Sequence, residues 1–148
     1  MSACCCPVAG NPVTASSILS AYAQLTNNVT VATVYPAFTT LLTVPITVPA
    51  PGGFLHIHST VSWALGALST GAVVRLEIDG AFVRPPGEET GAPGSGGSVS
   101  LVSRQSVAAG LRTVTLRLAS ATAGSVIIPA GTFPDIFGAA LLVEARSV

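Results

Sequence analysis

Two histidines, His56 and His58, are the residues best placed to bind a metal ion. In an extended segment alternate side chains share one face, so the two imidazoles would lie roughly 7 Å apart. Both rings could then bind one metal, but a zinc site needs three or four ligands and the local sequence supplies no third. Asp79 from a neighbouring strand, or histidines gathered around a threefold axis, could complete the set. The sequence favours the alternative, a histidine pair hydrogen-bonded on a sheet face or at an interface.

Three consecutive cysteines, Cys4 to Cys6, are the only thiols of the chain. An odd cluster at one end cannot build a spaced disulfide framework within one chain, and a bridge between adjacent cysteines strains the backbone. Zinc sites space their thiolates about two to four residues apart, and no second pair follows. The cluster indicates a thiol-bearing terminal arm, with cross-linking between subunits as the alternative.

The acidic and hydroxyl residues give no pattern typical of catalysis. No Gly-x-Ser-x-Gly elbow is present, and glycoside hydrolysis needs two positioned carboxylates. Glu88 and Glu89 fall in a predicted exposed loop, while Glu77 and Asp79 fall on a predicted outward strand face. We therefore expect a protein that is not an enzyme and needs no cofactor.

The composition indicates a protein that buries surface against other chains. Only 8% of the 148 residues are charged, against about 25% in an average soluble domain, and 49% are hydrophobic. A surface so short of charge is expected to be partly covered in an oligomer. Nucleic acid and membrane are not expected as partners, because there is no basic stripe and no apolar run of about 18 residues. No secretory signal is recognisable, so export by the usual route is not expected.

The first 38 residues differ in composition from the rest and are predicted to form an N-terminal arm for assembly or docking. Ile18, Tyr22 and Leu25 recur with helical spacing, which predicts a short helix whose apolar stripe binds a partner. The alternative is a helix or strand that packs on its own domain.

From Thr39 onward the hydrophobic residues recur with period two, as in strands with one buried face. About eight short strands separated by Gly- and Pro-rich turns predict an all-β domain over residues 39–148, an antiparallel jelly-roll β-sandwich. Turns are expected at Pro51 to Gly53 and at Ala109 to Gly110. The residues predicted to pack in the core or in a trimer contact are Phe54, Trp63, Leu76, Leu116, Phe137 and Leu141.

Two further segments have distinct signals. Asp79 and Gly80 stand between alternating stretches and predict a two-residue hairpin, because both tolerate positive φ. Residues 85–97 are of low complexity and predict an exposed loop without regular structure.

Four segments together resemble the trimeric jelly rolls of the C1q and tumour-necrosis-factor type, particularly those of bacteriophage head-fibre and capsid decoration proteins. They are Pro51 to Ile57, Val74 to Gly80, Ala109 to Leu116 and Phe137 to Glu144. The resemblance implies a homotrimer on the outer capsid surface of a virion, bound to the major capsid protein or another virion protein and produced in the cytoplasm of the host cell. Two alternatives are a receptor- or glycan-binding tip of a tail fibre, acting through residues 85–97, and a small metal-dependent hydrolase using His56 and His58.

Overall fold

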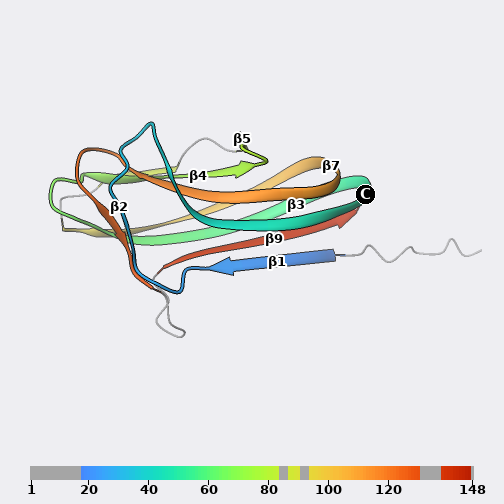
Figure 1. Cartoon of the computed structure of the whole chain (residues 1–148), viewed down its shortest axis with the longest axis horizontal. Coiled ribbons are helices and arrows are strands. Elements are labelled where there is room, and N and C mark those ends of the chain that lie inside the picture. The colour runs from blue at the N-terminus through green and yellow to red at the C-terminus, as the bar shows by residue number, and fades with distance from the viewer. Residues whose placement is uncertain (1–17, 84–86, 91–93, 131–137, 148) are drawn as a thin grey trace, which may run out of the picture.

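The computed structural model describes residues 18–83, 87–90, 94–130 and 138–147, and these residues form nine strands and no helix (Figure 1). The strands are β1 (Ile18–Gln24), β2 (Val29–Val31), β3 (Thr39–Leu65), β4 (Gly71–Ile78), β5 (Ala81–Phe82), β6 (Gly87–Thr90), β7 (Gly96–Ser120), β8 (Val126–Ile128) and β9 (Ala139–Ser147). Every pairing between named strands is antiparallel. The predicted all-β antiparallel fold is confirmed. Among the described residues, none forms a helix able to span a lipid bilayer.

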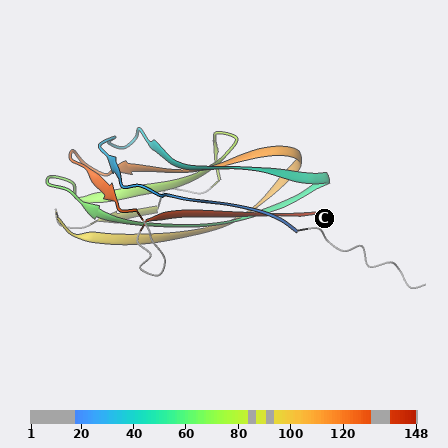
Figure 2. The ribbon, with the colours of Figure 1, turned by 60° about the horizontal axis from the view of Figure 1, so that its bottom comes forward.

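The strands belong to one sheet that folds over on itself. Its main order is β1-β9-β3-β7-β4-β5, with β2, β6 and β8 paired beside this path. The two long strands, β3 and β7, pair with each other and both pass from one layer to the other (Figure 2). The first layer holds β1, β9, the second half of β3 and the first half of β7. The second layer holds the other halves of β3 and β7 together with β4, β5 and β6.

The two predicted turns lie where the long strands cross between the layers. The β3–β7 register shifts between Val48 and Gly52, and pairing then resumes between Gly52 and Ala108. Gly52 and Gly110 have φ angles of 128° and 116°, which only glycine adopts readily. The predicted turns are thus bends within β3 and β7, and strands predicted as separate are halves of one strand.

The core fills the space between the layers with alternating side chains. Val44, Ile46 and Val48 of β3 are buried, while Thr43 and Thr47 between them are exposed. The fully buried large side chains are Leu55, Ile57, Leu76, Leu116, Leu118, Ile128, Leu141, Val31, Val44, Val48, Val61 and Val74. The period-two pattern therefore assigned the core face correctly along these strands.

The helix predicted around Ile18 and Tyr22 is wrong, because these residues lie on β1, which pairs with β9 along its whole length. Residues four apart share a face in both a helix and a strand, so this spacing could not distinguish the two. Leu25 follows β1, and its amide donates to the carbonyl oxygen of Ala139. Of the predicted arm, residues 18–24 and β2 thus belong to the sheet, and residues 1–17 lie outside the described residues.

The hairpin at Asp79 and Gly80 is confirmed. The two residues have φ angles of 51° and 81° and join β4 to β5, with Ile78 paired to Ala81. By contrast, the absence of regular structure predicted for residues 85–97 is wrong over β6, which pairs with Gly71 to Val74 at the edge of β4. Strand pairing uses backbone groups, so a sequence of low apolar content could still extend this edge.

Candidate functional site

The first layer turns one face away from the core, and its side chains form rows across four strands. His56 of β3 lies between Arg104 of β7 and Glu144 of β9, and Ser20 of β1 follows Glu144. His58 lies in the next row. The name histidine face is used below for three rows of outward residues: Arg104, His56, Glu144, Ser20; Val102, His58, Leu142, Tyr22; and Ser106, Phe54, Arg146, Ile18.

The two histidines lie on this face at neighbouring outward positions of β3. His56 is half-buried and His58 is exposed. Among the described residues, no group of three His, Cys, Asp or Glu side chains is placed to hold a metal ion. Asp79 lies on the hairpin of the second layer and so does not join them. The arrangement found is a histidine pair on a sheet face.

Charged groups of opposite sign flank the central strand of the histidine face. Arg104 lies with its guanidinium carbon 4.1 Å from the centroid of the Phe54 ring, a cation–π contact, and makes no ion pair with the described residues. On the other side of β3, Glu144 accepts a hydrogen bond of 3.0 Å from Arg146. The face thus carries a cation without an ion-pair partner among the described residues on β7, and an Arg–Glu ion pair on β9.

The same face also exposes large hydrophobic side chains. Ile18, Tyr22 and Val102 are 53%, 59% and 54% exposed, and Leu142 between them is half-buried. The hydroxyl of Tyr22 donates to Oε1 of Gln24 at 2.8 Å, which leaves the ring on the surface. A protein interface commonly combines such aromatic and aliphatic side chains with arginine.

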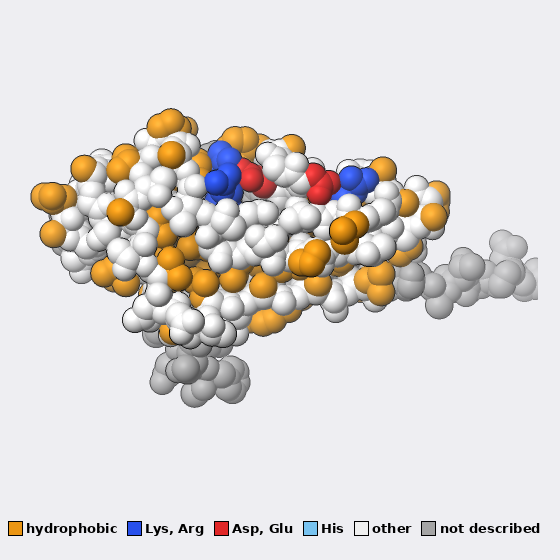
Figure 3. Space-filling model, viewed as in Figure 1, with side chains coloured by type: hydrophobic (Ala, Val, Ile, Leu, Met, Phe, Trp, Pro, Cys, Tyr) orange, Lys and Arg blue, Asp and Glu red, His pale blue; other side chains and the backbone are white. Residues whose placement is uncertain are grey.

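A different cluster occupies the outer face of the second layer. Glu77, of which 4% is exposed, pairs with Arg75 on its own strand and with Arg117 on β7 at 3.4 Å. Arg75 is stacked between the rings of Phe38 and Phe82, at 4.2 and 3.9 Å from their centroids. Figure 3 shows the charged side chains of this face gathered in one short row. Because Arg75 and Arg117 are direct neighbours across the strand pair, Glu77 offsets the repulsion between them.

Asp79 ties the β4–β5 hairpin to β7. Its carboxylate accepts a hydrogen bond of 2.8 Å from the backbone amide of Thr113 and one of 3.0 Å from Arg112. The amide of Thr113, followed by the Arg112 side chain, lowers the pKa of Asp79 below its ordinary value of 3.8. This contact fixes the hairpin and is far from the histidine face.

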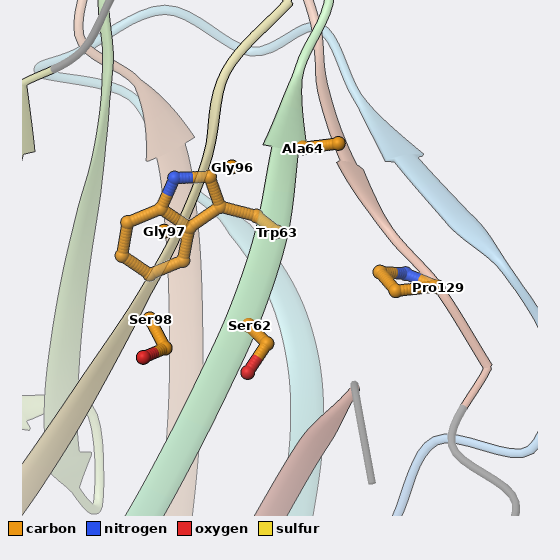
Figure 4. Close-up of a pocket in the computed structure, with 7 residues that line it drawn as sticks. All are labelled: Ser62, Trp63, Ala64, Gly96, Gly97, Ser98 and Pro129. Carbon is orange, nitrogen blue, oxygen red and sulfur yellow. The ribbon is translucent and has the colours of Figure 1, made fainter. Parts of the chain in front are cut away.

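A shallow cavity of about 340 Å³ lies at one end of the sandwich. It is lined by Ser62, Trp63, Ala64, Gly96, Gly97, Ser98 and Pro129 (Figure 4). Trp63 and Gly97 are partners across the β3–β7 pair, as are Ser62 and Ser98, whose hydroxyls point the same way. None of these lining residues is charged, so the cavity offers hydroxyl groups and an apolar wall but no acid or base.

Four of the six residues predicted for packing lie in the hydrophobic core, namely Trp63, Leu76, Leu116 and Leu141. Phe54 is half-buried on the histidine face beneath Arg104, and Phe137 lies outside the described residues. Glu88 and Glu89, predicted on an exposed loop, lie on β6.

The sequence predicts part of the histidine face. Ile18, Tyr22, Phe54 and the two histidines have distinct signals, whereas Arg104, Glu144 and Val102 have none of their own. Each of these three residues lies next to at least one buried residue on β7 or β9. That alternation marks an outward position, but which strands lie beside β3 follows only from the topology.

No protein-family model matches the chain, and no curated protein matches it. Among solved structures, dimeric latent PorU from Porphyromonas gingivalis has a TM-score of 0.56 at 10% identity, over 89% of this chain and 13% of PorU. A protein of Bacillus endospore appendages, described as disulfide-linked pili, has a TM-score of 0.39 at 11% identity, over 100% and 99% of the two chains. A chain of infectious bursal disease virus has a TM-score of 0.42 at 11% identity, over 91% and 37%. The likeness to PorU shows a shared β fold, and this chain corresponds to a small part of PorU.

Proposed function

We propose that the chain is a non-enzymatic structural protein that works as one subunit of an assembly of copies of itself. The observation that carries this proposal is the histidine face, where Ile18, Tyr22 and Val102 are each more than half exposed. In a chain with 8% charged residues, burying such a face removes apolar area from water without stranding many charges.

The state of the acidic residues supports a structural role. Glu77 is held by two arginines, Asp79 by Arg112 and a backbone amide, and Glu144 by Arg146. Each carboxylate is engaged in a contact that stabilises the fold or its surface. None of these three lies in the cavity beside Trp63.

The finer form of the proposal is a virion structural protein, either a capsid decoration protein or a head fibre. It rests on the resemblance of residues 51–144 to the trimeric jelly rolls of such proteins. In this form the chain is a homotrimer on the outer capsid surface and the major capsid protein is its partner.

Two measurements test the proposal. The first is the solution mass of the purified chain by light scattering, with and without reductant because of Cys4 to Cys6. An oligomer supports self-assembly, a trimer supports the finer form, and a monomer at high micromolar concentration contradicts both. The second is co-sedimentation with capsids that lack the protein. Saturable binding supports decoration, whereas binding to cells or glycans but not to capsids supports the receptor-binding alternative.

A further inference from the structure

We propose that the histidine face packs against the same face of a second copy, around a twofold axis that runs along β3. This inference deepens the proposed function, because it names the contact through which copies associate. The rows of the face extend on both sides of β3, with β7 on one side and β9, followed by β1, on the other. Rotation about β3 therefore places β7 of one copy over β9 of the other and leaves β1 at the margin of the contact.

The charges of the face match under this rotation. Arg104 of each copy comes to lie over Glu144 of the other, and His56 lies over its own equivalent. Within one chain Arg104 has no ion-pair partner among the described residues. The second copy supplies one in Glu144, which also accepts a hydrogen bond from its own Arg146. Two copies of one face thus form two Arg–Glu contacts, as an isologous interface requires.

The apolar side chains match as well. Val102 comes to lie over Leu142 of the other copy, in the row next to the charged one. Sheets that pack face to face keep their strands within about 30° of each other. If the two β3 strands cross between His56 and His58, the rows of Arg104 and of Val102 lie on either side of the crossing and stay aligned.

The overlapping part of the face has the size of a weak interface. Three strands spaced about 4.8 Å apart, over about nine residues of β3, cover roughly 440 Å² per copy. The total of roughly 900 Å² is typical of a weak association that depends on concentration. This contact leaves the second layer free, so a trimer formed through other surfaces would become a hexamer of two trimers.

A charge-swap experiment tests the contact. Arg104→Glu places two glutamates opposite each other, and Glu144→Arg places two arginines opposite each other, so each variant alone should associate at least about tenfold more weakly than the native chain. When the two variants are mixed, positions 104 and 144 carry opposite charges across the contact. Heteromers should therefore form in the mixture, read out by light scattering and by energy transfer between labelled variants.

Arg112→Glu, on the second layer, is the charge-matched control and should leave the association unchanged. Thermal unfolding of each variant, followed by circular dichroism, shows whether the fold is intact. A mixture that gains no heteromer, or an Arg104→Glu chain with the native mass, overturns the contact while leaving the proposed self-assembly standing. A native chain that is always monomeric overturns both.

Discussion

Gly53 and Arg146 approach so closely that a side chain at position 53 has no room. A Cβ atom on Gly53 would lie 1.9 Å from the carbonyl oxygen of Arg146, far inside van der Waals contact. This is the point where β3 leaves its bend and begins to pair with the end of β9. The absence of a side chain at Gly53 therefore allows β3 to pair with the end of β9.

Gly53→Ala should lower the free energy of unfolding by about 2 to 3 kcal/mol, because the β9 backbone must shift to admit the methyl group. Urea denaturation measures the change. Thr47→Ala, at an exposed position of the same strand, is the control and should change stability by less than about 0.5 kcal/mol. Equal stability of the two variants would contradict the close approach.

Trp63→Ala should lower the free energy of unfolding by about 3 to 5 kcal/mol, because the side chain is only 5% exposed and its removal opens a large cavity in the core. Tyr22→Ala is the aromatic control, since that ring is 59% exposed, and it should cost little. Chemical denaturation followed by circular dichroism compares the two. A Trp63 variant of native stability would mean that the faces of β3 are assigned the wrong way round.

Glu77→Gln should lower the free energy of unfolding by about 3 kcal/mol. Without the carboxylate, Arg75 and Arg117 face each other with no anion between them in a largely buried site. Glu144→Gln removes an ion pair that is much more exposed and should cost less than about 1 kcal/mol.

A triple variant separates the loss of charge compensation from the loss of packing at the Glu77 cluster. Arg75→Met, Glu77→Leu and Arg117→Met together should be more stable than Glu77→Gln alone, because no buried charge is left unpaired. A triple variant less stable than the single one would show that the cluster stabilises through its hydrogen bonds, including that of Arg117 to the carbonyl oxygen of Phe38.

Asp79 should make stability depend on pH in the acid range. Its pKa is lowered on folding, so the unfolded chain binds the proton more tightly and the stabilisation is present above pH about 4. It is lost as the pH falls through the lower, folded pKa. Because the side chain is 43% exposed, the contribution should stay below about 1 kcal/mol.

Asp79→Asn isolates this effect, because asparagine keeps the turn preference of the hairpin but does not titrate. The difference in unfolding free energy between native chain and variant should shrink between pH 5 and pH about 2. A difference that is constant over this range would show that the Asp79 contacts add nothing that depends on its charge.

The sequence predicted the features that depend on local pattern. The alternation of Val44, Ile46 and Val48 with threonines identified the core face, and Asp79-Gly80 identified the hairpin, because side-chain period and positive φ are properties of neighbouring residues. The spacing of Ile18 and Tyr22 could not identify β1, since that strand is defined by its pairing with β9 at the other end of the chain.

The candidate site was predictable only in part, for the same reason. His56 and His58 are visible as a pair, but Arg104 and Glu144 join them through strands about 48 and 88 positions away in the chain. Their proximity is set by long-range pairing, which one sequence does not report. Likewise, Gly52 and Gly110 predict a change of chain direction, but they do not indicate that β3 and β7 remain paired on both sides of it.

Truncation of the N-terminal region should separate its contribution to the fold from its contribution to assembly. Deleting residues 1–38 removes β1, which pairs with seven residues of β9, and Val31 of β2, which is 1% exposed in the core. We expect this truncation to unfold at a markedly lower temperature, because the edge of the first layer and part of the core are lost together. Deleting only residues 1–17 leaves both strands and should keep the native unfolding temperature. Circular dichroism melts compare the two, and the shorter deletion can then be tested for capsid binding as a folded chain.

Two outcomes decide between the roles of this region. Native stability after removal of residues 1–38 would show that β1 and β2 add nothing to the stability of the sheet. Loss of capsid binding in the folded shorter variant would support a docking arm within residues 1–17.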